Sequence, residues 1–167
     1  CWNNKEFFEK NLYDKDPIDE LAQENPEIFI NCSASPTRAK KEQLKHNMLS
    51  FIAKKYNTPI VYVNQVGAID NSSFDGSSRV FDADGKLLAR AKSFEEQFLI
   101  VNPKEKIGKI YPLTKGLDKS LNEQKVFTLE YESDLERTYK TIVQGIRDYF
   151  KKCGFKRAVL GLSGGLD

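Results

Sequence analysis

The sequence predicts a mixed α/β protein made of two parts that a linker joins. Three features indicate this class. Strand-like and helix-like segments alternate over residues 1–102, this order is lost over residues 103–131, and a long amphipathic helix then leads into a short strand and a glycine-rich loop. We therefore expect a first domain over 1–102, a linker over 103–131 and the start of a second domain over 132–167.

The first predicted domain contains a strand followed by a helix. Residues 28–30 are a short apolar run that predicts a buried strand. The helix is predicted from a stripe of apolar residues at helical spacing and ends at residues 58–59. The stripe consists of Leu44, Met48, Phe51 and Ile52. The lysines that fall largely off this stripe, which we expect to face solvent, are Lys40, Lys41, Lys45 and Lys54.

Four further strands are predicted in the same domain. Residues 60–63 are rich in β-branched and aromatic side chains, which favour a strand. Residues 78–81 and 86–89 flank the dipeptide Asp84-Gly85, which tolerates the positive φ of a tight turn and so predicts a hairpin. Residues 98–101 supply the last strand.

A second helix is predicted at the start of the second domain. Ser133 and Glu136 have the spacing of a capping box, in which both side chains satisfy free backbone N–H groups at a helix start. Gly154 offers a left-handed stop, and residues 158–160 predict a strand that runs into the closing loop. The apolar face of this helix consists of Leu135, Tyr139, Ile142, Ile146 and Tyr149.

Charge and composition favour a small-molecule partner. Lys and Arg number 26 against 24 Asp and Glu, so the net charge of +2 points to neither nucleic acid nor a membrane. No apolar run reaches the roughly 18 residues that a membrane span needs. The cysteines are odd in number and widely spaced, which predicts neither a disulfide framework nor a zinc site and fits a reducing cytoplasm. The sequence opens without methionine and closes inside a glycine turn, so we expect an internal piece of a longer protein.

The closing glycine loop allows two interpretations. A short strand that runs into Ser163, Gly164 and Gly165 suits phosphate binding, because residues without a Cβ let several backbone N–H groups converge on one anion. Asp167 could hold a metal ion that neutralises phosphate. A plain glycine turn is the alternative, since the loop lacks the Gly-Lys-Ser/Thr of the usual P-loop.

Residues 159–167 resemble the Ser-Gly-Gly-x-Asp-Ser loop of the ATP pyrophosphatase superfamily, whose members split ATP between the α and β phosphates to adenylate a substrate. The resemblance implies ATP and Mg²⁺ as substrate and metal. The residues that it assigns to ATP are Gly161, Ser163, Gly164, Gly165 and Asp167. The preceding helix, which reads Gly-Ile-Arg-Asp-Tyr over residues 145–149, is similar to the opening helix of NAD synthetase domains, and we assign its side chains no catalytic role.

Three blocks of the first domain resemble nitrilase-type glutaminase domains that are fused to NAD synthetases. They are Asn-Cys-Ser-Ala-Ser-Pro at 31–36, Tyr-Val-Asn-Gln-Val-Gly at 62–67 and Phe-Asp-Gly-Ser-Ser at 74–78. Three separated blocks in the same order make the match specific. The resemblance implies the C-terminal part of a nitrilase-like αββα sandwich over 1–102, and the start of a Rossmann-like ATP pyrophosphatase domain after the linker.

The resemblance also assigns glutamine-binding residues. In that family the serine before proline and the lysine six positions later contact glutamine, which carries over to Ser35 and Lys41. From the residues alone, Ser35 before Pro36 either caps a helix or donates to substrate, and Lys41 is either solvated or paired with an α-carboxylate. A helix that began at Pro36 would turn Lys41 away from Ser35, so we expect a few irregular residues between them. Residues expected to shape the same region through hydrogen bonds are Asn64, Asp75 and Ser77.

Glutaminase chemistry of this family needs a nucleophilic cysteine, a lysine and a general-base glutamate. The family's glutamate and lysine lie upstream of the residues present in this chain. Cys1 touches Trp2 directly, whereas the family's nucleophile lies four places before the tryptophan, so Cys1 aligns with a variable position instead. We expect Cys32 to pack as a small apolar residue and Cys153 to lie beside the helix stop without an activating charge. His46, the only histidine, is expected at the surface.

The resemblance implies a parent protein that adenylates deamido-NAD with ATP and Mg²⁺ and replaces AMP with ammonia from glutamine. Its partners would be these small molecules, with no nucleic acid and no membrane, and it would form homo-oligomers by family analogy. We expect the 167-residue piece alone to hydrolyse no glutamine. Two alternatives stay open: another nitrilase-type amidase fused to a different ATP pyrophosphatase, and a non-catalytic interaction or structural fragment.

Overall fold

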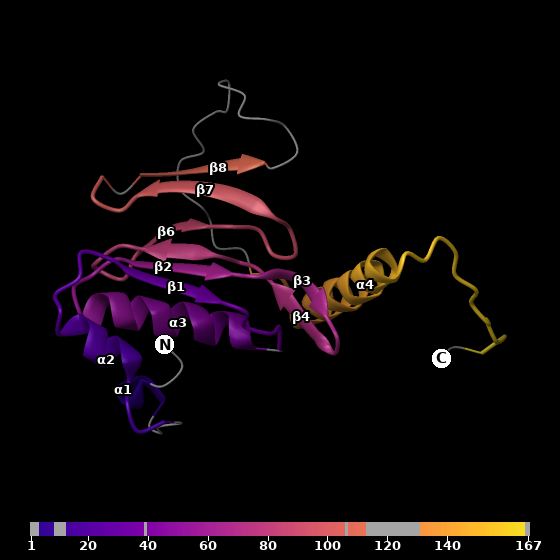
Figure 1. Cartoon of the computed structure of the whole chain (residues 1–167), viewed down its shortest axis with the longest axis horizontal. Helices are drawn as coiled ribbons and strands as arrows, with labels where there is room; N and C mark the ends of the chain where they lie inside the picture. The colour runs from indigo at the N-terminus through magenta and orange to yellow at the C-terminus, as the bar shows by residue number, and fades with distance from the viewer. Residues whose placement is uncertain (1–3, 9–12, 39, 106, 113–130, 166–167) are drawn as a thin grey trace.

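The computed structural model of the chain describes residues 4–8, 13–38, 40–105, 107–112 and 131–165 (Figure 1). These residues form a mixed α/β structure. In chain order the elements are α1 (Lys5–Phe8), α2 (Pro17–Ala22), β1 (Phe29–Ser33), α3 (Lys41–Lys55), β2 (Ile60–Asn64), β3 (Val66–Ile69), β4 (Ser72–Asp75), β5 (Arg79–Phe81), β6 (Leu87–Arg90), β7 (Gln97–Asn102), β8 (Ile107–Pro112) and α4 (Asp134–Cys153).

A four-stranded sheet in the order β1-β2-β5-β6 forms the centre of the predicted first domain. The β1–β2 pair is parallel, whereas β2–β5 and β5–β6 are antiparallel. Helix α3 lies along one face of this sheet (Figure 1). Burial of the shared apolar surface, worth about 25 cal/mol per Å², holds the two layers together. The core between them consists of Ile18, Phe29, Met48, Leu49, Ile52, Ala53, Ile60, Tyr62 and Phe81.

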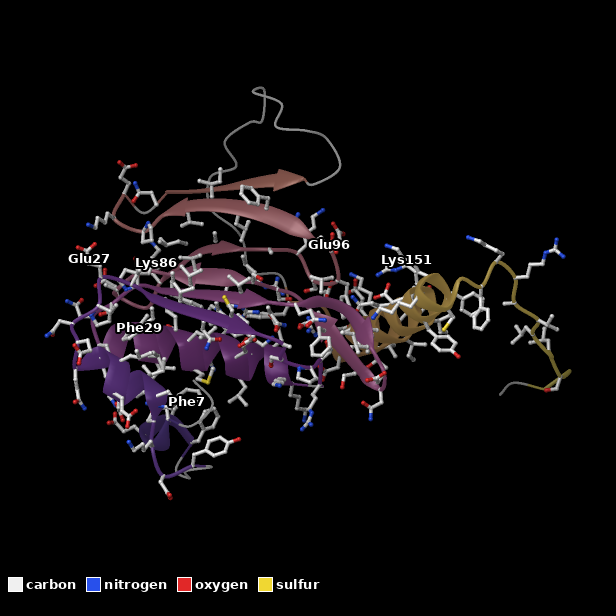
Figure 2. All side chains as sticks on the ribbon, viewed as in Figure 1. Phe7, Glu27, Phe29, Lys86, Glu96 and Lys151 are labelled. Atoms are coloured by element: carbon white, nitrogen blue, oxygen red, sulfur yellow. The ribbon has the colours of Figure 1, made fainter. Side chains whose placement is uncertain are left out.

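The short helices α1 and α2 extend the helical layer on the same side of the sheet (Figures 1 and 2). Phe7 of α1 reaches Phe51 of α3, with ring centroids 5.7 Å apart. Asp16 caps α2 by accepting a hydrogen bond from Ile18 N at 3.0 Å, and Pro17 follows as the first helical residue. Ile18 thereby enters the core, which fastens the N-terminal segment to the rest of the fold.

The four strands predicted after the first helix and the predicted hairpin turn are confirmed, with bounds shifted by one residue in the hairpin. Residues 60–63 lie in β2, residues 98–101 lie in β7, and β5 and β6 pair around the turn. Gly85 adopts φ +76°, and its carbonyl accepts a hydrogen bond of 2.6 Å from Ser50 Oγ of α3. The left-handed conformation and the close approach of α3 both favour glycine there.

Strand β8 extends the fold into the segment predicted as a linker. It pairs antiparallel with β7 from Gln97 opposite Pro112 to Asn102 opposite Ile107. The sequence did not indicate this strand, because Pro, Gly and Lys interrupt its apolar pattern. Regular pairing therefore continues at least to Pro112, and the domain boundaries stay a prediction.

A second hairpin, β3–β4, was also not predicted, and helix α4 is seated on it (Figure 1). Asp148 Oδ2 accepts a hydrogen bond from Ala68 N at 2.9 Å, and the Lys152 ammonium donates to the Ala68 carbonyl. Ser73 Oγ lies 2.6 Å from the side-chain amide of Gln144. The polar face of α4 thus makes this contact.

Both predicted ends of α4 are confirmed. Ser133 Oγ accepts from Glu136 N at 3.1 Å, and Gly154 closes the helix with φ +72°. The apolar stripe on the opposite side of α4 is exposed in the described part of the chain, from 57% at Ile142 to 81% at Leu135. Hence the apolar stripe makes the helix recognisable in the sequence, but it does not form the contact between α4 and the β3–β4 hairpin.

Two strand predictions need correction. Residues 158–160 form no strand, and Val159 and Leu160 are fully or largely exposed, because no described strand lies beside them to accept their backbone hydrogen bonds. Residues 28–30 do not form a strand buried on both sides: Phe29 faces the core of β1, but Ile30 is 68% exposed on the face of the sheet opposite α3.

Candidate functional site

Ser35, a predicted glutamine contact, lies in the segment that connects β1 to α3. Its backbone is held from both sides by Asn64 at the end of β2: Ser35 N donates to Asn64 Oδ1 at 2.8 Å, and Asn64 Nδ2 donates to the Ser35 carbonyl at 3.3 Å. The residue is only 6% exposed, yet its Oγ has no hydrogen-bond partner of regular geometry in the described part of the chain. A buried hydroxyl in this state is costly unless a ligand completes it.

A neighbouring phenol shares this environment. Tyr62 is fully buried beneath the segment, and burial raises the pKa of its hydroxyl, while the nearby Ser35 and Ser33 side chains oppose the rise. Burial of Tyr62 therefore places a second hydroxyl group close to Ser35.

Lys41, the second predicted contact, is the first residue of α3. Its ammonium donates to the Pro36 carbonyl at 3.3 Å, which brings it to the residue next to Ser35. Burial lowers the pKa of Lys41, and the charges of Lys45 and Arg38 lower it further. The predicted irregular segment between Ser35 and Lys41 is confirmed, whereas Pro36 does not begin the helix and Ser35 is not its cap.

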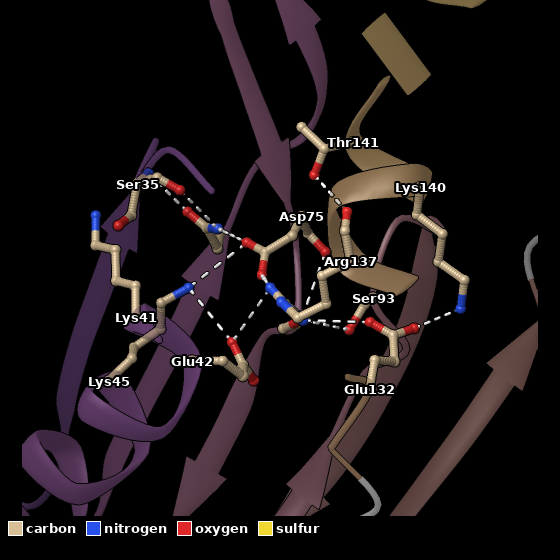
Figure 3. A network of polar contacts seen from close by, with 12 residues as sticks. Ser35, Lys41, Glu42, Lys45, Asp75, Ser93, Glu132, Arg137, Lys140 and Thr141 are labelled. Carbon is tan, nitrogen blue, oxygen red and sulfur yellow. Dashed lines mark hydrogen bonds and ion pairs between the residues drawn. The ribbon is translucent and has the colours of Figure 1, made fainter. Parts of the chain in front are cut away.

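A buried network of charged side chains lies behind this segment (Figure 3). Asp75, at the end of β4, is 1% exposed and pairs with Lys45 Nζ at 3.6 Å and with the Arg137 guanidinium of α4. Glu42 pairs with the Arg79 guanidinium and accepts from Arg90 at 3.0 Å. Buried charges are retained only when they are paired in this way.

The charges of the network shift the pKa values of Glu42 and Lys45. Burial would raise the pKa of Glu42, but the charges of Arg79, Arg90, Lys45 and Arg137 together hold it below its usual value. Burial lowers the pKa of Lys45, and the neighbouring Asp75 and Glu42 carboxylates oppose that effect. Glu42 can therefore act as a fixed acceptor behind the site at neutral pH.

The network reaches the segment of the predicted glutamine contacts through Asn64. Asn64 Nδ2 donates to Asp75 Oδ1 at 3.3 Å while the same side chain holds Ser35. Ser77, also fully buried, lies 3.4 Å from Asp75 Oδ2 and 2.9 Å from Ser93 Oγ. The structure thus brings together Asn64, Asp75 and Ser77, as expected.

Sequence reasoning missed most of this network. Lys45 was expected to face solvent, but it is 2% exposed, because Asp75 and Glu42 provide partners that the helical stripe does not show. A signal existed: Glu42 and Lys45 are three positions apart on one helix face, and Arg79 interrupts a short apolar strand. Neither pattern identifies Arg137 as the partner, since it comes from a distant helix.

The single histidine and the described cysteines differ in burial from what the sequence predicted, except at Cys153. His46 is half-buried and packs edge-on against Phe81 with ring centroids 5.0 Å apart, so the surface prediction is wrong. Cys32 lies exposed on the open face of β1, so the prediction that it packs as a small apolar residue is wrong. Cys153 ends α4, as predicted. Cys1 lies outside the described residues.

The predicted ATP loop is only partly described. Gly161, Ser163, Gly164 and Gly165 are exposed and lie in no helix or strand, and Asp167 is outside the described residues. Among the residues that the structure describes, no group of three His, Cys, Asp or Glu side chains could hold a metal ion. None of the described helices is long and apolar enough to cross a membrane.

The fold and the segment around Ser35 define a known class of protein. The chain belongs to the carbon-nitrogen hydrolase family, whose model matches residues 9–109. Residues 138–167 match the NAD synthase family. The chain is 36% identical over 166 residues to the glutamine-dependent NAD(+) synthetase of Synechocystis sp., covering 99% of this chain and 28% of that protein. It is 32% identical over 163 residues to the enzyme of the same name from Thermotoga maritima, covering 86% of this chain and 28% of that protein.

Solved structures give the same result. The glutamine-dependent NAD+ synthetase of Acinetobacter baumannii, solved with ADP, superposes with a TM-score of 0.66 at 28% identity over 83% of this chain and 24% of that one. The enzyme of the same name from Cytophaga hutchinsonii matches with a TM-score of 0.55 at 15% identity over 80% of this chain and 19% of that one, which supports the fold alone. The chain spans about 28% of the length of the curated relatives.

Proposed function

We propose that the full-length protein makes NAD by ATP-dependent amidation of deamido-NAD, with ammonia that it takes from glutamine. One observation carries this proposal: a single chain joins residues that match carbon-nitrogen hydrolases to residues that match NAD synthases. The 36% identity to the enzyme from Synechocystis sp., which runs through both segments and the connection between them, supports the same assignment.

In this proposal the first domain is the C-terminal part of an αββα sandwich and binds glutamine. Ser35 offers a buried hydroxyl that has no hydrogen-bond partner of regular geometry in the described ranges, and this hydroxyl is suited to a hydrogen bond with a polar group of the substrate. Lys41 offers an ammonium for the α-carboxylate, which would be a charge-assisted contact. The buried charges behind them hold the segment in place, and we assign to this chain binding and positioning instead of bond cleavage.

The second domain, in this proposal, begins a Rossmann-like ATP pyrophosphatase fold. Gly161, Ser163, Gly164, Gly165 and Asp167 would contact the phosphates of ATP, with Mg²⁺ as the metal. The A. baumannii relative was solved with ADP, which is consistent with nucleotide binding in this family. We extend to this protein a cytoplasmic location and homo-oligomeric assembly, both by analogy.

The test is an assay of the purified full-length protein. Supplied with deamido-NAD, ATP, Mg²⁺ and glutamine, it is expected to form NAD, AMP and glutamate in equal amounts. Omission of glutamine should abolish NAD formation, and ammonium chloride should restore it. Formation of AMP only with a different carboxylate acceptor would assign the protein to another amidase fused to an ATP pyrophosphatase. No consumption of ATP with any acceptor would leave the non-catalytic alternative.

A further inference from the structure

The contact between α4 and the first domain passes through one side chain that enters the buried charge network. Arg137 lies in the first turn of α4 and is only 6% exposed. Its guanidinium binds the Asp75 carboxylate, lies 3.8 Å from Glu42 and donates to a third carboxylate, Glu132, at 3.2 Å (Figure 3). The planar fork of arginine suits several carboxylates at once.

Asp75 connects Arg137 to the segment that is proposed to bind glutamine. Its Oδ2 meets Arg137, while its Oδ1 accepts from Asn64 Nδ2 at 3.3 Å. Asn64 in turn holds both backbone polar groups of Ser35. A continuous series of polar contacts therefore runs from α4 to the backbone of Ser35, and every side chain between its ends is at least nine-tenths buried.

The β3–β4 hairpin provides a second, parallel connection. Ser73 of β4 meets Gln144 of α4 through its hydroxyl, and its carbonyl accepts a hydrogen bond from Thr37 N at 2.8 Å. Thr37 lies two positions after Ser35 in the same segment. The start of α4 also reaches the start of α3, because Lys40 N donates to Asp134 Oδ1 at 3.4 Å. Helix α4 thus contacts the segment that carries Ser35 and Lys41 directly at Lys40 and, through Ser73, at Thr37.

Resting on the proposed function, we propose that Arg137 is a positioning residue for glutamine: it holds Asp75, and through Asn64 it holds Ser35 in the geometry that binds substrate. The helix that opens the NAD synthase match thereby controls glutamine capture in the other domain. Without Arg137, Asp75 keeps, among the described residues, one ion pair, with the more distant Lys45 at 3.6 Å, and the acceptor of Asn64 is no longer fixed. Arg137 itself touches no substrate.

The experiment compares Arg137→Met, Arg137→Lys and Lys151→Met in the full-length protein. Lys151 is the matched control, since it is an exposed cation on the same helix. NAD formation is measured with glutamine and, separately, with ammonium chloride as nitrogen source. We expect Arg137→Met to raise the KM for glutamine on the order of tenfold, and Arg137→Lys to raise it about threefold, because an ammonium restores the charge without the fork. Lys151→Met should match the wild type with both nitrogen sources.

The KM for glutamine shows whether Arg137 positions the binding segment or only stabilises the fold. Partial unfolding reduces the amount of active enzyme and so lowers the apparent kcat with both nitrogen sources, but it leaves KM unchanged. A normal KM for glutamine in Arg137→Met, whatever its rate, would overturn the inference. Should Arg137→Met fail to fold, the KM of Arg137→Lys decides in the same way. Wild-type protein that makes no NAD with either nitrogen source would instead overturn the proposed function.

A double-mutant cycle tests the route. If Arg137 acts through Asp75, the increase in KM caused by Arg137→Met together with Asp75→Asn should be clearly smaller than the product of the two separate increases. Independent effects, in which the increases multiply, would show that Arg137 reaches the site by another path and would overturn this part of the inference.

Discussion

Arg137 and Asp75 are 62 positions apart in the chain and form an ion pair that is almost completely buried. Asp75 ends a strand of the first domain, whereas Arg137 lies in the first turn of α4. The pair therefore connects the part of the chain that matches carbon-nitrogen hydrolases to the helix that leads into the NAD synthase match. Stability and glutamine binding should both depend on it.

We expect Asp75→Asn to destabilise the full-length protein strongly. The substitution keeps the shape of the side chain but leaves Lys45 and Arg137 without their shared carboxylate, and loss of one partner of a buried ion pair costs about 3 kcal/mol. The free energy of unfolding in urea measures the effect. The control is Asp70→Asn, an exposed residue with φ +52° that asparagine tolerates, which should change stability by less than about 0.5 kcal/mol. Equal losses in the two variants would contradict the prediction.

Ser35→Ala should separate binding from stability. Because Ser35 Oγ has no hydrogen-bond partner of regular geometry among the residues that the structure describes, its removal should change the free energy of unfolding by less than about 0.5 kcal/mol. The KM for glutamine should nevertheless rise about tenfold, the usual cost of a lost hydrogen bond to substrate. Ser72→Ala, a half-buried serine of β4, serves as control and should alter neither quantity. A large loss of stability with normal KM in Ser35→Ala would show that the hydroxyl is structural.

His46 should make stability depend on pH. Burial lowers the pKa of His46, and the Arg79 and Arg90 charges lower it further while Glu42 opposes them. The folded state therefore binds the proton less tightly than the unfolded state, whose histidine titrates near about 6.5. This contribution to stability is complete above that pH and is lost as the pH falls through the lower pKa of the folded state. Urea unfolding at pH 8 and at pH 5.5 should show a smaller loss in His46→Gln than in the wild type; an equal loss would refute the assignment.

Two glycines should respond to alanine in opposite directions. A Cβ at Gly85 would lie 2.5 Å from the Ser50 carbonyl oxygen, and φ is +76°, so Gly85→Ala should cost roughly 1–3 kcal/mol. Gly145 lies inside α4 with nothing within 4 Å of such an atom, so Gly145→Ala should stabilise the helix by about 0.8 kcal/mol. Urea unfolding of the full-length variants measures both changes. Opposite signs are expected, and a loss of stability in both would mean that Gly145 packs against a part of the protein outside the described residues.

The elements predicted correctly are those whose cause is local. The turn at Asp84 and Gly85 needs a positive φ that few residues adopt, and Ser133 accepts a hydrogen bond from a residue three positions later. Strand β2 follows from its β-branched and aromatic composition. In each case neighbouring residues contain the whole physical reason, so the sequence by itself determined these features.

Tertiary structure alone decided which charges are buried and which apolar groups are not. Lys45 is buried because Asp75 arrives from another strand, and Arg137 is buried because α4 is seated on the β3–β4 hairpin. Residues 158–160 have the composition of a strand but form none and are exposed, since a strand needs hydrogen bonds from a neighbour. The pairing of distant charges and strands depends on which distant segments of the chain lie side by side in the fold. No pattern within a single segment specifies that arrangement.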